Sequence, residues 1–552
     1  MELIDQHTKD IMEGCKVRAR DAGLQFEDET LEYIVTNRDL LELSPKMMIP
    51  TLYDYWVHDV EVLKEKGKYE LYPGNPYETV INTRPAISFY NDNNPDWLNV
   101  MIFYHVLAHI DLFQHNIFFR HTWDYDFNGR ALSDKRVIAR LRSEKGRWVD
   151  YLIEFARGID NLVGFHEALS RFNRHRETGP PAKLDYYFDV FLQSQKDFKI
   201  SKYIAEIDRY NQCRRESPTR YEDTFFAQID LNYPEFQALY QKYRDRHTSD
   251  HQDLFEFILT HSDFLNKEEN LWMKTVIHVV RQTGLFFQPQ IRTKIMHEGW
   301  ASYWHEKLFL QDDRIRGHEV EYARVNAGVT SLPRVGLNPY ALGMRLFQYI
   351  EEMADKGRYG YDYQRIMDQR QRAQYDTGGG GGQEAIFGIS RTYCDFMFIN
   401  EFVDQGFVDR HRLFVAGKRL NRKRMTWEYF VQSRNADAYR RMLIEGLYHP
   451  PHIGVDTRRT EEGPLVLIHH FEGKPLVTEF IANTMLGIEY LWGRPVILET
   501  TERIPTAPTP EPMTPGGLYA LMEEKEPPSA APWQRVRYQM ENRQLSREVL
   551  AD

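Results

Sequence analysis

The sequence predicts a mainly α-helical protein with small β elements. Amphipathic segments dominate residues 133–283, and only short stretches, such as 77–90, are rich in β-branched and aromatic residues. The length of 552 residues, with 42% hydrophobic residues, suffices for a large core. We expect a helical core over residues 1–430, a small α+β module over 431–502 and a Pro-rich extended tail over 503–552.

The composition excludes several classes of protein. A formal net charge of −11 argues against a nucleic-acid partner, because neutralising phosphates requires a basic surface. The three cysteines, Cys15, Cys213 and Cys394, are odd in number and far apart, which suits a reducing cytoplasm. The charged start lacks the apolar core of a signal peptide, and no apolar run approaches the ~20 residues of a membrane span. We therefore expect a soluble cytoplasmic protein without a transmembrane segment.

The N-terminal elements lead to a histidine pair. The pattern predicts helices with a charged face over residues 1–70 and one or two short strands over 77–90, broken at Pro85. The turn-forming cluster NDNNPD then opens a helix that carries His105 and His109. Because these residues are four positions apart, both imidazoles project from one side of the helix.

The spacing of His105 and His109 is that by which HExxH metallopeptidases hold zinc. Val106 stands where that motif has its general-base glutamate. A strand just before a metal-binding helix is also the zincin layout, in which an edge strand holds an extended substrate. By this analogy we expect a zincin-like helical core.

A second helix offers an acid to the histidine pair. The pattern predicts a helix over 292–310 that places Glu298, Ser302 and His305 on one face, where a core helix would carry leucine. We expect His105, His109 and Glu298 to bind one divalent cation, zinc or another metal, with an open position for water. The alternative is that Glu298 caps or pairs with a neighbouring helix.

His305 is too far from Glu298 to share one ion, because the two lie ~10.5 Å apart along a helix that rises ~1.5 Å per residue. Metal-assisted activation of a carbonyl is the chemistry of peptide or amide bond hydrolysis or transfer. The catalytic acid/base candidates that could replace the missing glutamate are His305, Asp111, Asp395 and Glu401.

Asp395 has two interpretations, as a partner to a ligand histidine or as an intrahelical pair with Arg391. If none of the candidates reaches the open position, either the metal-bound water acts without a base, or the chemistry differs, for example amide formation or transfer, which needs no hydrolytic water.

Beyond these helices the pattern changes. Pro339 starts another helix, on which Arg345 pairs with a carboxylate near the metal or with a surface acid. The five glycines at 378–382 lack a following Lys-Ser/Thr and predict a flexible loop. The basic cluster at 410–424 predicts a solvated hairpin or a contact with an acidic partner. Over 449–499 the order strand, strand, helix, strand predicts the small module, and the prolines that follow predict the extended tail.

Several motifs resemble those of the stage V sporulation protein R (SpoVR) family, and the likeness extends over most of the chain. The blocks that carry it are YETVIN at 77–82 with Pro85 and Ala86; His109 with Phe113 and Asn116; FQPQ at 287–290 leading into EGWASYWH at 298–305; NPYALG at 338–343; and RTYCD at 391–395 through Phe398 and Ile399 to Glu401 and Phe402. The EGWASYWH and NPYALG blocks are the most specific. His297 and Asn326 depart from the family pattern, so neither is expected to be an essential ligand.

The resemblance implies a role in spore cortex formation in spore formers, although the family also occurs in bacteria that form no spores. It also implies a pathway shared with an AAA-type serine kinase and a von Willebrand-type protein, which family members are often encoded beside. Three functions stay open: a zinc-dependent enzyme acting on a protein or peptide, a two-metal or redox centre, and a non-catalytic scaffold or regulator in cortex assembly or stress response. Metal content separates them.

Overall fold

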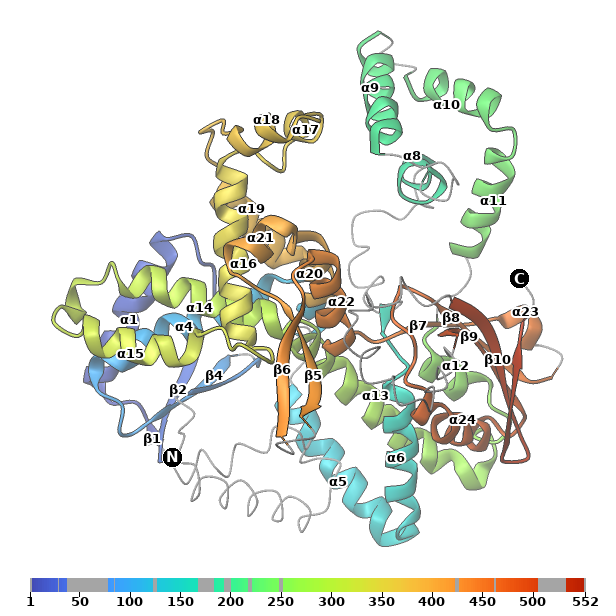
Figure 1. Cartoon of the computed structure of the whole chain (residues 1–552). Coiled ribbons are helices and arrows are strands. Elements are labelled where there is room, and N and C mark those ends of the chain that lie inside the picture. The colour runs from blue at the N-terminus through green and yellow to red at the C-terminus, as the bar shows by residue number, and fades with distance from the viewer. Residues whose placement is uncertain are drawn as a thin grey trace. The chain divides into compact units, whose positions relative to one another are not determined.

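The computed structural model describes most of the chain (Figure 1). The described residues are 2–27, 29–36, 78–83, 85–122, 127–166, 183–192, 200–216, 221–247, 252–421, 426–460, 463–504 and 533–550. Their structure is mainly helical with small sheets, which confirms the expected class. Among the described helices, none combines the length and the apolar character that crossing a bilayer requires.

The chain folds into two compact units. Unit 1 comprises Met1–Leu169, Asp253–Met353 and Gly380–Asp552, and unit 2 comprises Ser170–Gln252 and Ala354–Gly379. Every residue that the sequence singles out for metal binding or catalysis lies in unit 1.

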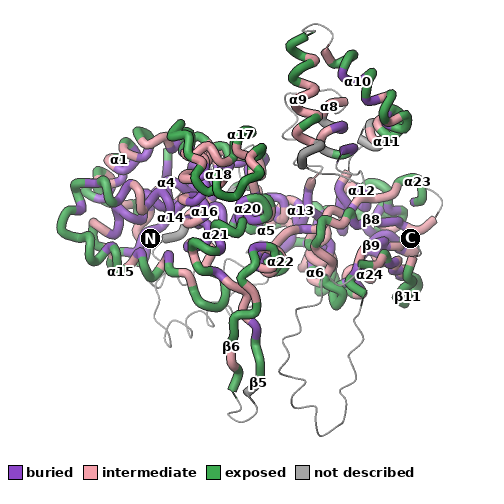
Figure 2. Tube along the Cα trace, turned by 45° about the horizontal axis from the view of Figure 1, so that its top comes forward, coloured by how far each residue is buried: buried purple, intermediate pink, exposed green. Residues whose placement is uncertain are grey.

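The core of unit 1 is built around two helices, α4 (Asp96–His115) and α14 (Lys294–Phe309). α4 is apolar on all sides and is buried from Leu98 to Phe113, so it runs through the core rather than along its surface. Both helices are largely purple, the colour of buried residues, in Figure 2. The helix expected over 292–310 is confirmed as α14.

Helix α16 (Pro339–Asp355) crosses α14 at a pair of glycines. A Cβ atom on Gly299 would overlap the backbone of Gly343, and one on Gly343 would overlap the backbone of Ile295 and Gly299. Only glycine lets two helix backbones approach this closely. The crossing explains why the two most specific sequence blocks, EGWASYWH and NPYALG, each contain a glycine.

The chain before α4 forms a sheet with the strand order β1-β2-β4-β3. The elements are β1 (Glu2–Leu3), α1 (Gln6–Asp21), β2 (Thr30–Val35), β3 (Glu78–Ile81) and β4 (Ala86–Asn91). β2 pairs with β4 in parallel, and the other pairs are antiparallel. The short strands expected over 77–90 are confirmed. β2 is a strand where helices were expected, because TLEYIV is rich in residues that favour a pleated sheet. Residues 37–77 lie outside the described part.

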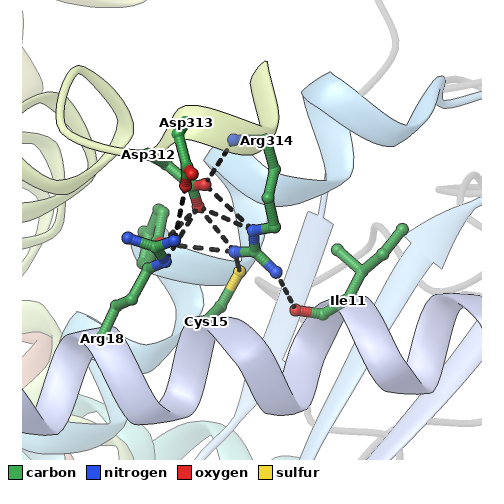
Figure 3. A network of polar contacts seen from close by, with 7 residues as sticks. Ile11, Cys15, Arg18, Asp312, Asp313 and Arg314 are labelled. Carbon is green, nitrogen blue, oxygen red and sulfur yellow. Dashed lines mark hydrogen bonds and ion pairs between the residues drawn. The ribbon is translucent and has the colours of Figure 1, made fainter. Parts of the chain in front are cut away.

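A polar network ties α1 to the segment that follows α14 (Figure 3). Arg314 donates from Nη2 to Asp312 Oδ2 at 2.6 Å, and the same nitrogen lies 3.2 Å from Cys15 Sγ. Tyr104 on α4 donates to Asp312 at 2.7 Å. Burial, opposed by Arg314, raises the pKa of the Cys15 thiol to about 11, so this thiol is a packed side chain and not a nucleophile. The network thereby links α1 and α4 through one buried carboxylate.

The remaining helices of unit 1 precede the C-terminal sheet. They are η1 (Ile117–Thr122), α5 (Phe127–Lys145), α6 (Trp148–Asp160), α12 (Leu254–His261), η4 (Glu268–Asn270), α13 (Leu271–Arg292), η5 (Asp313–Ile315), α15 (Glu319–Thr330), α19 (Gly382–Thr392), α20 (Asp395–Phe402), α21 (Gln405–Arg410) and α22 (Ala436–Gly446). Lys418 and Arg419 of the basic cluster lie on a hairpin of β5 (Val415–Asn421) and β6 (Thr426–Ser433), which is mostly exposed in Figure 2, whereas Arg410 ends α21 and residues 422–425 lie outside the described part.

The C-terminal sheet has the order β11-β10-β9-β8-β7. Its elements are β7 (His452–Val455), α23 (Thr457–Thr460), β8 (Leu465–His470), α24 (Thr478–Trp492), β9 (Val496–Arg503), β10 (Trp533–Glu541) and β11 (Gln544–Val549). β7, β8, α24 and β9 confirm the expected order. β10 and β11 differ from the expected extended tail, because Val536, Tyr538 and Met540 alternate along β10 and are buried. The Pro-rich residues 505–532 lie outside the described part.

Unit 2 consists of short helices with an aromatic core. Its elements are α8 (Lys183–Asp185), the π-helix η2 (Tyr186–Phe191), α9 (Ile200–Glu216), α10 (Tyr221–Asn232), α11 (Phe236–His247), α17 (Tyr361–Gln364) and α18 (Gln369–Gln374). Tyr187, Phe191, Phe225 and Phe236 are buried against one another. Unit 2 thus has a hydrophobic core of its own.

Candidate metal centre

The facing sides of α4 and α14 bring the three expected ligands together. His109 Nε2 lies 3.4 Å from Glu298 Oε2, and His105 Nε2 lies 3.8 Å from the same oxygen. One donor atom from each residue lies within 4.8 Å of the others, and all three residues are buried. These side chains could hold a metal ion, and we call them the α4–α14 site.

Two carboxylates fix the position of α14. Asp395, the first residue of α20, accepts hydrogen bonds from two backbone N–H groups at the start of α14 at 2.8 and 2.9 Å, and so caps that helix. Asp111 on α4 accepts a hydrogen bond from Trp300 Nε1 at 3.0 Å. Because α14 is held at both points, Glu298 faces α4.

Burial sets the charge states at the site. It lowers the pKa of His109 to about 3, so this imidazole is neutral at pH 7. Burial alone would raise the pKa of Glu298, but interactions with His105, His109 and His297 hold it well below its usual range. A neutral imidazole and an ionised carboxylate are the forms that bind a metal ion.

The second oxygen of Glu298 faces other groups. Lys294 Nζ pairs with Oε1, and His297 Nε2 lies 3.7 Å from it. The Lys294 side chain is 53% exposed, so it connects this buried carboxylate to the protein surface. Tyr340 of α16 stacks on His105, with ring centroids 6.1 Å apart. Oε1 is therefore held by protein groups, and Oε2 faces the histidine pair.

His305 contacts the far side of His105 and not Glu298. The two Nδ1 atoms are 2.9 Å apart, and His305 Nε2 lies 2.9 Å from Asn326 Oδ1. Asn326 donates from Nδ2 to Glu306 Oε2 at 2.8 Å. Burial lowers the pKa of His305 to about 3, so its ring is neutral. These four residues form a hydrogen-bonded relay that runs from Glu306 to His105.

Glu306 assigns the direction of every hydrogen bond in the relay. A carboxylate only accepts, so Asn326 presents its NH₂ to Glu306 and its oxygen to His305. His305 Nε2 then carries a hydrogen, and its Nδ1 accepts from His105 Nδ1. The lone pair of His105 consequently lies on Nε2, the atom that faces Glu298 Oε2 at 3.8 Å. Two imidazole nitrogens and one carboxylate oxygen that face one another are donors that fit a divalent metal such as Zn²⁺.

The four acid/base candidates have different surroundings. Only His305 touches one of the three candidate ligands, His105. Asp111 and Asp395 hold α14, and burial raises their pKa values to about 6 and about 7 against the hydrogen bonds that they accept. Glu401 is exposed and accepts a hydrogen bond from a tyrosine at 2.7 Å. Of the four candidates, His305 therefore lies next to the candidate metal ligands, and the three carboxylates have other partners.

A cavity of about 480 Å³ lies at the outer end of the relay. Asn326, Glu306, Tyr322 and Arg345 line it. Arg345 donates from Nη1 to the backbone oxygen of Thr330 at 3.3 Å. Arg345 thus borders this cavity, next to the relay.

The sequence predicted the three donor residues, but not all of the residues that surround them. Lys294 and Glu306 could have been predicted as neighbours of the site, since both lie on α14 beside expected site residues. His297 departs from the family pattern and yet borders the ligand carboxylate. Asn326 had no local signal, because only the tertiary fold brings α15 against His305.

Comparisons with known proteins point to one family. A family model described as SpoVR like protein matches residues 2–448. The chain is 22% identical over 494 residues to the uncharacterized protein YcgB of Escherichia coli strain K12, which covers 84% of this chain and 86% of that protein. No solved structure matches the chain. The matched residues include the α4–α14 site and end before the C-terminal sheet begins at His452.

Proposed function

Because this chain belongs to the SpoVR family and the matched region contains the α4–α14 site, we propose that it is a zinc-dependent enzyme acting on peptide or amide bonds. The observation that carries the proposal is the buried set of two imidazoles and one carboxylate around a single point. Catalytic zinc sites use three such protein ligands and keep one position for water or substrate. A structural zinc site would be closed by a fourth ligand.

A zinc ion held by His105, His109 and Glu298 supplies Lewis acidity, which polarises a carbonyl and lowers the pKa of water towards ~7. Lys294 places a positive charge beside Glu298, where it stabilises negative charge that develops on a substrate oxygen. His305 contacts His105 and Asn326 and so orients His105.

His297 is the base that we assign in place of the missing glutamate. Thr293 Oγ1 donates to the backbone oxygen of Pro289 at 2.8 Å, so it accepts from His297 Nδ1, which lies 3.2 Å away. The lone pair of the neutral ring then lies on Nε2, 3.7 Å from Glu298 Oε1. From there it takes a proton from the attacking group and returns it to the leaving nitrogen.

The surrounding elements support a zincin-like arrangement. β4 leads directly into α4, and β3 is the outer strand of its sheet among the described residues. An outer strand can pair with an extended peptide and hold it near the metal ligands. In a spore-forming host we assign this activity to cortex formation, alongside an AAA-type kinase and a von Willebrand-type protein.

One observation favours a scaffold instead. Lys294 pairs with Glu298, so this buried carboxylate has a compensating charge without any metal. The pair lies within one turn of α14, and Glu298 also contacts both histidines of α4, so the polar cluster can hold the two helices together. In that case the polar cluster binds no cation.

The test uses the full chain without a His tag, stripped of metal and reloaded with Zn²⁺. We expect about one tightly bound zinc per chain and turnover of a mixed library of peptides and amides. Mass spectrometry distinguishes hydrolysis, in which the products gain one water, from transfer, in which they do not. We expect Glu298→Gln to lose both metal and turnover, while the surface variant His318→Asn keeps both. A folded, metal-free wild type would establish the scaffold.

A further inference from the structure

A second group of histidines lies at the start of the C-terminal sheet of unit 1. His452 and His470 are direct cross-strand partners in β7 and β8, so their side chains share one face, and their ring centroids are 4.6 Å apart. The ring of His166, which follows α6, lies 4.8 Å from that of His452. The ring of His452 therefore lies close to two other imidazoles, one from β8 and one from the segment after α6. We call these three histidines the β7–β8 cluster.

The backbone is shaped to present His166 to the strands. Phe165 has a φ of 49°, a left-handed conformation that is unfavourable for a bulky residue. A Cβ atom on Gly164 would overlap the ring of His166, which folds back over this glycine. The chain thus adopts a strained turn whose effect is to bring the imidazole of His166 to that of His452.

A carboxylate completes the group. Glu472 lies two residues beyond β8, and His449 Nε2 contacts its Oε2 at 3.0 Å. Only one residue separates Glu472 from His470 at the end of β8, so its carboxylate is a further oxygen donor next to this strand.

We propose that His166, His452 and His470, with Glu472, form a second binding site for a divalent transition-metal ion. Imidazole nitrogens suit zinc, copper and nickel, and a carboxylate compensates part of their charge. The ion would connect His166, which lies in the family-matched region, to strands beyond it. It would thereby fasten the C-terminal sheet to the helical core. This proposal does not depend on the proposed enzymatic function.

Binding at this cluster requires the rings to turn. Among the described residues, only the α4–α14 site has three donor atoms within 4.8 Å of one another. His470 is exposed and His452 is half-buried, so an ion can enter from solvent. We therefore expect weaker binding than at the α4–α14 site.

The experiment titrates Zn²⁺ into the full, untagged chain carrying His109→Asn and Glu298→Gln, which removes two ligands of the other site. We expect about one zinc to bind and to raise the melting temperature. Adding His452→Asn and His470→Asn should abolish both effects, whereas adding His318→Asn, on an exposed histidine elsewhere, should change neither. Zinc binding that survives the loss of His452 and His470, or no binding at all, overturns the proposal.

A spectroscopic readout avoids any further substitution. Cu²⁺ added to the same His109→Asn, Glu298→Gln chain should give an electron paramagnetic resonance spectrum with splitting from several imidazole nitrogens. Far-UV circular dichroism confirms that the chain is folded. A spectrum of copper bound without nitrogen ligands would contradict the assignment.

Discussion

Two groups of histidines in unit 1 offer the same kind of donor atoms in opposite surroundings. The α4–α14 site lies on two buried helices, its donor atoms are already gathered, and a relay of hydrogen bonds orients one ligand. The β7–β8 cluster lies on a strained turn and two strands, it is partly exposed, and its donors are not yet gathered. Burial and hydrogen-bonded partners hold donor side chains in place before an ion binds, which favours tight binding and catalysis. Exposed rings must first be ordered, so they suit a weakly bound ion that links two parts of the fold.

We expect the largest difference between the two groups from a substitution at the crossing of α14 and α16, which supports only the α4–α14 site. Gly299→Ala places a methyl group against the backbone of Gly343, so we expect the free energy of unfolding to fall by ~2–3 kcal/mol and tight zinc binding to be lost. Chemical denaturation and zinc titration measure the two effects. Gly328→Ala is the matched control, because nothing lies within 4 Å of its Cβ position and alanine favours a helix by ~0.5–1 kcal/mol. Equal stability of the two variants would refute the close crossing.

The relay offers a smaller and more selective change. Asn326→Leu removes the acceptor of His305, so the tautomer of His105 is no longer imposed, and we expect zinc affinity at the α4–α14 site to fall ~10–100-fold. Gln348→Leu also removes a hydrogen bond to Glu306, at 3.3 Å, but leaves His305 untouched, and it should keep wild-type affinity. Nitrogen NMR of the histidine rings should report a changed tautomer only in Asn326→Leu. If both variants bind zinc as the wild type does, the relay has no orienting role.

The turn before His166 should affect only the second group. Gly164→Ala displaces the ring of His166, so we expect zinc affinity at the β7–β8 cluster to fall about tenfold while the α4–α14 site is unchanged. Gly158→Ala, in α6, is a suitable control because its Cβ would meet one atom at 4.0 Å. Competition with a zinc chelator resolves the two affinities. A loss at both sites would show that the groups are not independent.

The smallest effect is a pH dependence of stability at the start of α14. Burial, opposed by two backbone hydrogen bonds, raises the pKa of Asp395 from 3.8 to about 7. A raised pKa in the folded state stabilises the protein fully below about pH 4, and this contribution is lost as the pH rises through about 7. The stability of the wild type relative to Asp395→Asn should therefore decrease over that range. Denaturant unfolding of the metal-free proteins measures it, and a difference that stays constant with pH would exclude a raised pKa.

The sequence predicted the α4–α14 donors because each signal is local. The i, i+4 spacing of His105 and His109 and the polar face around Glu298 follow from helix geometry alone, as does the separation of Glu298 from His305. The orienting role of Asn326 depends on how α15 packs, and no periodicity encodes that. The three donor residues could therefore be predicted from the sequence, whereas Asn326, which orients them through His305, could not.

The fold shows the same division. Strands 452–455 and 465–470 were predictable from short β-branched runs, and α14 from its periodicity. β10 was missed because the preceding prolines suggested an extended tail for the whole segment, although Val536, Tyr538 and Met540 alternate as a half-buried strand requires. Its pairing with β9 is a long-range contact across the Pro-rich residues.

Measuring the zinc content of the α4–α14 site alone tests whether His105, His109 and Glu298 bind a metal ion. The full, untagged chain carrying His452→Asn and His470→Asn is loaded with Zn²⁺, desalted and analysed by inductively coupled plasma mass spectrometry. We expect about one zinc per chain, reduced to none when Glu298→Gln is added to a chain that remains folded. Zinc content that is the same with and without Glu298, or no zinc in either protein, would contradict the proposed metal site.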